Sequence, residues 1–269
     1  MPRLYRVEAP TAAIKPSARS SINANDSGRH SVAIGAALLA GAGLTAYALP
    51  ALAGVSGAAG APALPAMRRL LGVADRTSSG RGYALTFDDG PHPRGTPAVL
   101  DILDRAGVPA TFFLVGEQVR RSPGLAREIL AAGHEVGLHC DRHRNLLRLT
   151  PWQVREDLDR ARETICAETG REIALYRPPY GILNAAALAS ARARRWRVLL
   201  WRHWGLDWQQ RATAESIAAR VTSGVGEGAV LLLHDADDYS APGSWARTAA
   251  ALPRVLEALA ARGLYAAPV

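Results

Sequence analysis

The chain has 269 residues, 48% of them hydrophobic and 21% charged, which excludes a collagen-like, a mostly disordered or a many-spanning membrane protein. Its two cysteines are too few for a disulfide-rich scaffold or a four-cysteine zinc module. The formal net charge is +8, but residues 80–269 carry 24 basic and 21 acidic side chains, and this balance predicts no nucleic-acid partner, since a phosphate-binding surface needs clustered basic residues.

The first 79 residues are predicted to form three segments ahead of the main domain. Residues 1–30 are a polar, net basic lead, residues 31–50 a transmembrane or signal segment, and residues 51–79 a flexible tether rich in Ala, Gly and Pro. No charged residue occurs from Ser31 to Met67. Within this run, Val32 to Leu49 is close to the lower limit of about 17–25 residues for a membrane-spanning helix.

Three interpretations of the apolar segment are open. Basic residues before it and few after it predict a cytoplasmic N-terminus and an external main domain. The segment can remain as a membrane anchor, or it can be removed as a signal peptide after Ala51-Leu52-Ala53. The third interpretation is a buried core helix rich in Ala and Gly. The first two predict an extracytoplasmic protein that is membrane-anchored or secreted.

From Tyr83 onward, short apolar runs alternate with amphipathic stretches. The apolar runs have the length of strands and are Tyr83–Phe87, Ala110–Val115, His134–His139, Ile173–Arg177, Trp196–Trp201 and Ala229–His234. The helical patterns are Thr96–Ala106, Pro123–Ala132, Thr150–Thr169, Asn184–Ala193, Thr213–Val221 and Trp245–Arg262. This alternation predicts one α/β domain over residues 80–269, with parallel strands and crossover helices in a barrel or an open sheet.

The helix that follows Thr150 has the clearest boundaries. Thr150 can be its N-cap, Pro151 suits the first helical position and Gln153 completes a capping box. Gly170 is the expected stop.

Polar residues lie at the predicted C-terminal ends of strands, where parallel α/β folds carry their chemistry. Asp88 and Asp89 follow the first strand, and Gly90 allows a sharp turn. Adjacent carboxylates point in different directions, so one can bind a cation while the other faces a bound water. His139 and His143 follow the third strand, and two histidines with one carboxylate are a common ligand set for a catalytic divalent metal.

Two later strand ends add complementary groups. Arg177 begins the sequence Arg-Pro-Pro-Tyr-Gly; an arginine behind a carboxylate keeps it ionised, and the stiff Pro-Pro pair fixes a loop whose N–H can face developing negative charge. In the last strand Leu232 and His234 share a face, so an apolar contact lies beside a possible proton donor. Each pattern alone is commonly structural, but their occurrence in order at successive strand ends favours an active site.

Together these motifs resemble those of the polysaccharide deacetylases, carbohydrate esterase family 4, which include chitooligosaccharide, chitin and peptidoglycan N-acetylglucosamine deacetylases. The resemblance covers about Tyr83 to Leu264, and its motifs are Thr86-Phe87-Asp88-Asp89-Gly90, His139-x-x-x-His143, Arg177-Pro178-Pro179-Tyr180, Asp207-Trp208 and Leu232-x-His234. It implies a distorted (β/α) barrel with fewer than eight strands, preceded in this chain by the membrane-anchor or signal helix.

The resemblance implies a metal-dependent hydrolase. Asp89, His139 and His143 would hold a divalent metal, with zinc favoured and cobalt, nickel or manganese as alternatives. Asp88 would be the base that takes a proton from the attacking water, and His234 the acid that protonates the departing amine.

Five further residues would support this chemistry. Arg177 would orient the base, Asp207 would hold the acid and raise its pKa, and the backbone N–H of Tyr180 would stabilise the oxyanion. Trp208 and Leu232 would line a small pocket for the acetyl methyl group.

Two positions depart from the family pattern. Cys140 stands where Ser or Thr is usual, and a thiol is a weaker hydrogen-bond donor, which puts the support of that loop in question. Trp204 stands where a second aspartate is usual, so tuning of the acid depends on Asp207 alone. A disulfide between Cys140 and Cys166 is a further possibility.

The leading functional hypothesis is removal of N-acetyl groups from an amino-sugar polymer or oligosaccharide. The alternatives are an O-acetyl esterase, a small-molecule amide deacylase on the same machinery, and a non-catalytic carbohydrate-binding protein. The expected partners are an N-acetylated glycan and, through the N-terminal segment, the membrane.

Overall fold

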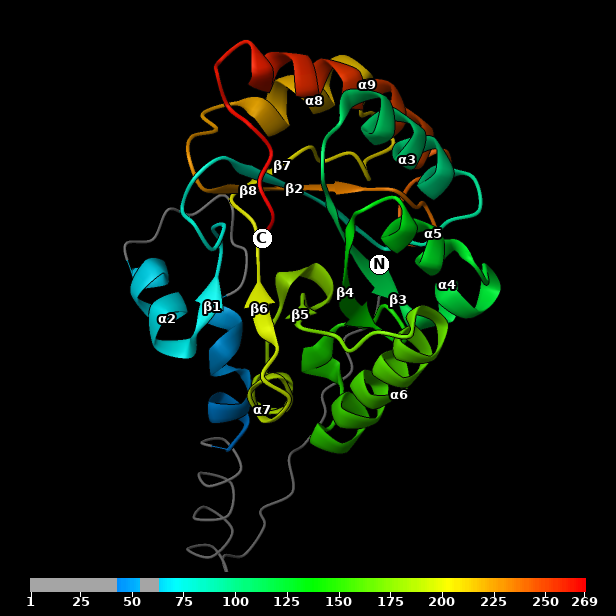
Figure 1. Cartoon of the computed structure of the whole chain (residues 1–269). Helices are drawn as coiled ribbons and strands as arrows, with labels where there is room; N and C mark the ends of the chain where they lie inside the picture. Colours follow the sequence, from blue (N-terminus) through cyan, green and yellow to red (C-terminus); the bar gives the residue numbers. More distant parts are fainter. Residues whose placement is uncertain (1–42, 54–62) are drawn as a thin grey trace, which may run out of the picture. The chain divides into compact units, whose positions relative to one another are not determined.

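The computed structural model describes residues 43–53 and 63–269, and at its centre lies a curled sheet of eight strands (Figure 1). In sheet order the strands are β1 (Val73–Ala74), β6 (Arg197–Leu199), β5 (Leu175–Tyr176), β4 (Glu135–Cys140), β3 (Thr111–Val115), β2 (Tyr83–Asp88), β8 (Ala229–His234) and β7 (His203–Trp204). All neighbouring strands are parallel. Within the described ranges no pairing joins β7 to β1, so the sheet is an open half-barrel.

The number of strands corrects the expectation of fewer than eight. All six predicted strands form, and the two additional ones, β1 and β7, lie at the two edges of the sheet. Each of these edge strands has two residues, which is too short for alternation of apolar and polar side chains to indicate a strand. The prediction of an α/β fold with parallel strands is confirmed.

Helices cover the outer face of the sheet (Figure 1). They are α2 (Ala63–Leu71), α3 (Gly95–Ala106), α4 (Gly116–Arg121), α5 (Leu125–Ala131), α6 (Pro151–Thr169), α7 (Ala185–Ala193), α8 (Ala214–Thr222) and α9 (Ser244–Ala260), with 3₁₀ turns at Leu49–Ala53, Leu146–Arg148 and Pro179–Gly181. Helices α3, α8 and α9 lie together beside β2 and β8, whereas α4, α5 and α6 lie beside β3 and β4. Of these, α2 and α4 were not predicted.

Side chains that cap the N-terminus set the start of three helices, one of which the sequence predicts. Thr150 accepts a hydrogen bond from the N–H of Gln153, whose side chain accepts one from the N–H of Thr150, so the predicted capping box of α6 is confirmed. Asn184 and Thr213 cap α7 and α8 in the same position. Gly170 ends α6 with a φ of 67°, a left-handed conformation that glycine adopts without strain.

Strand β2 is buried along its whole length and determines the position of the site. Phe87 stacks on Phe112 of β3 with the ring centroids 5.0 Å apart. The parallel register pairs Asp88 with His234 at the C-terminal ends of β2 and β8. The two groups predicted to be base and acid are therefore brought side by side by strand pairing.

Elements of secondary structure form before residue 80. Helix α2 and strand β1 occupy part of the segment expected to be a tether, and β1 pairs with β6 through Val73 and Ala74. The predicted basic lead (residues 1–30) and most of the predicted apolar segment (residues 31–50) lie outside the described residues. Among the helices that are described, none is both long enough and apolar enough to cross a membrane.

A chain that begins at Ser79 is expected to be less stable than one that begins at Ala63, because it lacks β1 and the buried Val73. Burial of one valine side chain contributes about 2 kcal/mol, which corresponds to a melting temperature lower by ~4–8 °C. Thermal denaturation of the two chains followed by circular dichroism measures the difference. Equal melting temperatures would contradict the assignment of β1 to the domain.

Candidate functional site

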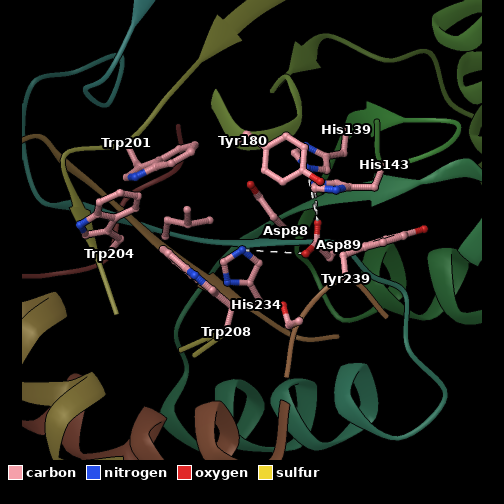
Figure 2. A pocket seen from close by; sticks show the side chains of 12 residues that line it. Asp88, Asp89, His139, His143, Tyr180, Trp201, Trp204, Trp208, His234 and Tyr239 are labelled. Atoms are coloured by element: carbon pink, nitrogen blue, oxygen red, sulfur yellow. Dashed lines mark ion pairs between the residues drawn. The ribbon is translucent and has the colours of Figure 1, made fainter. Parts of the chain in front are cut away.

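The C-terminal ends of β2, β4 and β8 border one pocket of about 270 Å³ (Figure 2). Eight of the ten predicted site residues line it: Asp88, Asp89, His139, His143, Tyr180, Trp208, Leu232 and His234. The other two, Arg177 and Asp207, lie behind the wall and bond to the side chains of Asp88 and His234. The residues that the sequence placed at separate strand ends thus form one site.

Asp89, His139 and His143 form a cluster with the geometry of a metal site. Asp89 Oδ1 lies 3.5 Å from His139 Nε2 and 3.4 Å from His143 Nε2. The backbone of Asp89 has a φ of 79°, a conformation that costs energy in a residue with a side chain. This backbone conformation turns the Asp89 carboxylate toward the two imidazoles, while the Asp88 side chain points away from Asp89 (Figure 2).

The donor set fits a divalent metal. Asp89 Oδ1 is buried and accepts no hydrogen bond from the described residues, although buried carboxylate oxygens are normally satisfied. Nδ1 of His139 contacts the backbone oxygen of Arg177 at 2.7 Å; a carbonyl only accepts, so Nδ1 carries the proton and the Nε2 lone pair is free for a metal. Burial lowers the pKa of both His139 and His143 to about 3, so both rings are neutral at physiological pH.

Asp88 is held by the buried guanidinium of Arg177. Arg177 Nη1 donates to Asp88 Oδ1 and to Thr86 Oγ1, both at 2.7 Å. The guanidinium also packs on the face of Phe113, 4.1 Å from the ring centroid. Burial raises the pKa of Asp88, and the positive charge of Arg177 opposes this rise. The arrangement suits a base whose position is fixed and whose second oxygen is left for a proton.

His234 is paired with Asp207. Asp207 Oδ1 lies 3.0 Å from His234 Nδ1, and Asp207 Oδ2 accepts from the backbone N–H of His234 at 2.7 Å and from Thr248 Oγ1 at 2.8 Å. Burial disfavours the imidazolium, but the charge and hydrogen bond of Asp207, with the charges of the two neighbouring aspartates, raise the pKa of His234 to about 10. His234 is therefore protonated at neutral pH and can donate from Nε2, which lies 4.0 Å from Asp89.

Tyr180 lies at the mouth of the pocket. Its backbone has a φ of 59° and the residue is 54% exposed. Its ring meets the ring of His143 edge-on, with the ring centroids 4.4 Å apart. Among the described residues its backbone N–H has no acceptor. The turn after Pro178 thus leaves one backbone donor beside His143 without an acceptor among the described residues.

The pocket contains residues that sequence reasoning missed. Tyr239, in the loop after β8, stacks on His143 with the centroids 4.6 Å apart, donates to Glu117 Oε1 at 2.5 Å and accepts from Gln118 Nε2 at 3.0 Å. Trp201 and Trp204 line the side opposite the histidines. The sequence predicts none of these three at the site, and it marks Trp204 only as a departure from the family pattern.

The loop after β4 is supported by Asp157 of α6, which also was not predicted. Its carboxylate accepts from the backbone N–H of Asp141 at 2.9 Å and of Arg142 at 3.3 Å, and it pairs with Arg144 at 2.6 Å. The presence of Cys140 therefore does not leave the loop without support. Cys140 is a free, buried thiol whose pKa burial raises well above its usual value.

The possible Cys140–Cys166 bridge does not form, since both cysteines are free.

A second cluster of metal-ligand type does not fit a metal as well as the first. It consists of His92, Asp237 and Asp238. His92 Nδ1 accepts from the backbone N–H groups of Gly95 at 2.8 Å and Arg94 at 3.2 Å. The proton of the neutral ring is therefore on Nε2, which lies 3.3 Å from Asp237 Oδ1. Because Nδ1 accepts two hydrogen bonds and Nε2 faces Asp237, this group fits a loop contact better than a metal.

Comparison with known proteins agrees with this geometry. Residues 75–198 match the family model described as polysaccharide deacetylase. A chitooligosaccharide deacetylase from Bradyrhizobium is 36% identical over 215 residues, which cover 76% of this chain and 94% of that protein. The peptidoglycan N-acetylglucosamine deacetylase of Listeria monocytogenes is 34% identical over 160 residues, which are 60% of this chain and only 34% of that longer protein.

A solved structure shares the fold as well. The family 4 carbohydrate esterase from Streptomyces lividans, in complex with acetate, superimposes with a TM-score of 0.61 at 32% identity. The match covers 69% of this chain and 91% of that one.

Proposed function

The chain belongs to the polysaccharide deacetylase family, and we propose that it is a metal-dependent hydrolase that removes N-acetyl groups from amino-sugar glycans such as chitooligosaccharides or peptidoglycan. The bond broken is a carbon–nitrogen bond outside a peptide. The observation that carries the proposal is the placement of a fixed carboxylate, Asp88, and a protonated imidazole, His234, beside one cluster of metal-ligand type.

Asp89, His139 and His143 would hold the metal. Two imidazoles and one carboxylate are ligands that zinc accepts while keeping positions open, and cobalt, nickel or manganese can use the same set. When bound, such an ion supplies Lewis-acid polarisation of the acetyl carbonyl and lowers the pKa of a water molecule.

Of the remaining residues, Asp88 and His234 transfer protons, and the others hold these two groups or stabilise developing charge. Asp88 accepts a proton from the water whose oxygen forms a bond to the acetyl carbon, and Arg177 holds Asp88 in place for that transfer. The N–H of Tyr180 donates to the oxyanion that develops. His234 then donates its proton to the nitrogen as the carbon–nitrogen bond breaks, giving acetate and a free amine. Asp207 keeps His234 charged and oriented.

The same machinery could cleave an O-acetyl ester or a small amide, and a pocket of this kind could bind glycan without turning it over. The Bradyrhizobium and Listeria relatives, both named as deacetylases of N-acetylated glycans, favour the amide of an amino sugar. From the basic residues that precede it, we further propose that the segment at residues 31–50 exports or anchors the protein.

Acetate release tests the proposed function. The full chain, freed of metal with a chelator and then supplied with Zn²⁺ or Co²⁺, is incubated with chitooligosaccharide, peptidoglycan and acetyl-xylan. We expect release from one of the first two, dependent on added metal. Release from acetyl-xylan alone would identify an esterase, and glycan binding without any release would identify a binding protein. Either result would overturn the proposal.

A further inference from the structure

One side of the pocket is lined by apolar side chains. Trp201, Trp204 and Trp208, here called the indole wall, line the pocket together with Leu232. Trp201 and Trp204 lie on the side of the pocket away from His139 and His143, with the acid and the base between the two sides (Figure 2). A substrate whose carbonyl faces the metal cluster would extend its acyl group toward this wall.

The indole wall is a continuous row that starts at the acid. The ring centroids of Trp208 and His234 are 5.4 Å apart. Those of Trp204 and Trp208 are 5.3 Å apart, and those of Trp201 and Trp204 are 5.9 Å apart. Trp208 and Leu232 are adjacent to the reacting centre, where an acetyl methyl would end. Trp204 and Trp201 continue the apolar surface beyond that point.

The shape of the wall suits a flexible chain better than a sugar ring. Adjacent indoles are inclined by 43° and 61°, so the row presents edges and faces in turn instead of one flat surface. Trp201 is only 5% exposed and Leu232 is buried, so the far end and the floor of the row are enclosed, whereas Trp204 and Trp208 are half-buried. A pyranose ring stacks on an open aromatic face, whereas a few methylene groups fit an enclosed, angular space.

We infer that the indole wall is an acyl-binding pocket that selects N-acyl groups longer than acetyl, of three or four carbons, on the amino sugar. This inference rests on the proposed function, because it takes the position of the carbonyl from it. The reaction is the same hydrolysis: water adds its oxygen to the acyl carbon, the carbon–nitrogen bond breaks, and the products are propionate or butyrate and the free amine.

The test compares chitotriose whose amino groups carry acetyl, propionyl or butyryl groups, with the full chain and added Zn²⁺. We expect kcat/KM to rise with chain length, by up to roughly fourfold for each buried methylene. In Trp204→Ala the butyryl-to-acetyl ratio should fall at least fivefold, whereas Trp204→Phe, which keeps an aromatic wall, should retain most of it. Trp152→Ala, a change at a tryptophan that is 69% exposed, is the matched control and should leave the ratio unchanged.

A second measurement does not depend on turnover. Acetate, propionate and butyrate are titrated into the metal-loaded protein while tryptophan fluorescence is recorded, and affinity should increase with chain length in the unmodified protein but not in Trp204→Ala. Activity confined to acetyl groups, with no gain in carboxylate affinity, would overturn the inference and leave the proposed function intact. An equal fall in kcat/KM for all three substrates in Trp204→Ala would also overturn the inference, and it would indicate that Trp204 binds the sugar. If no substrate is hydrolysed, the proposed function fails and the selection of N-acyl groups fails with it, and a carboxylate affinity that still rises with chain length would show an apolar binding pocket only.

Discussion

Asp88→Asn is expected to keep its metal while kcat falls by ~10²–10⁴-fold, the usual weight of general-base catalysis. The Asp88 side chain bonds to Arg177 and belongs to no metal-ligand group among the described residues. Asparagine keeps an oxygen that can accept from Arg177 Nη1, so the buried guanidinium is not left without an acceptor. It cannot, however, take a proton from water.

His139→Ala should have the opposite pattern. It removes one of three candidate ligands and the contact of Nδ1 with the backbone oxygen of Arg177, so bound metal should be lost and activity with it. Metal content by elemental analysis, kcat and melting temperature are measured for both variants. Asp101→Asn, on the exposed surface of α3, is the control. Equal loss of metal from Asp88→Asn and His139→Ala would contradict the division of roles between Asp88 and Asp89.

The sequence was sufficient to predict the site wherever a functional residue followed a strand of normal length. Asp88, His139 and His234 each end a strand that the apolar pattern marks clearly, and parallel pairing then brings the strand ends to one edge of the sheet. Arg177 also ends a predicted strand, whereas the role of Asp207 came from the family resemblance, and the structure shows the hydrogen bonds of both residues to the base and the acid.

Other features depend on contacts between distant segments, for which the local sequence carries no signal. Tyr239 stacks on His143, and Asp157 reaches the loop after β4 from one turn of a long amphipathic helix. Nothing in the residues around Tyr239 or Asp157 distinguishes them from ordinary loop or helix residues. The same holds for β1, which is a strand only because β6 offers a free edge. Trp204 was visible as an unusual residue, but only the structure places it in a row with two other indoles.

The position of Trp204 leads to the second large expected effect. In the described structure Asp207 is the one carboxylate within hydrogen-bonding distance of the His234 side chain. The residue at position 204 is an uncharged tryptophan that packs on Trp208, so it adds no second negative charge near His234. Raising of the His234 pKa to about 10 therefore depends chiefly on Asp207, against the opposing effect of burial. A divalent cation bound at Asp89 would cancel the attraction of that carboxylate, so the alkaline limb of the metal-loaded enzyme should lie below this value.

Asp207→Asn should move the alkaline limb of kcat to lower pH by about one pH unit or more. A histidine whose charged form is stabilised loses its proton at higher pH, so removal of the stabilising charge makes His234 lose its proton earlier and the acid becomes inactive sooner as pH rises. The acidic limb, set by Asp88, should change little, and metal content should be retained.

His234→Ala should instead lower kcat at every pH, because the proton donor itself is absent. The pH–rate profiles of the unmodified protein and both variants on one N-acetylated oligosaccharide distinguish these effects, and an unmoved alkaline limb in Asp207→Asn would show that another group sets the pKa of the acid.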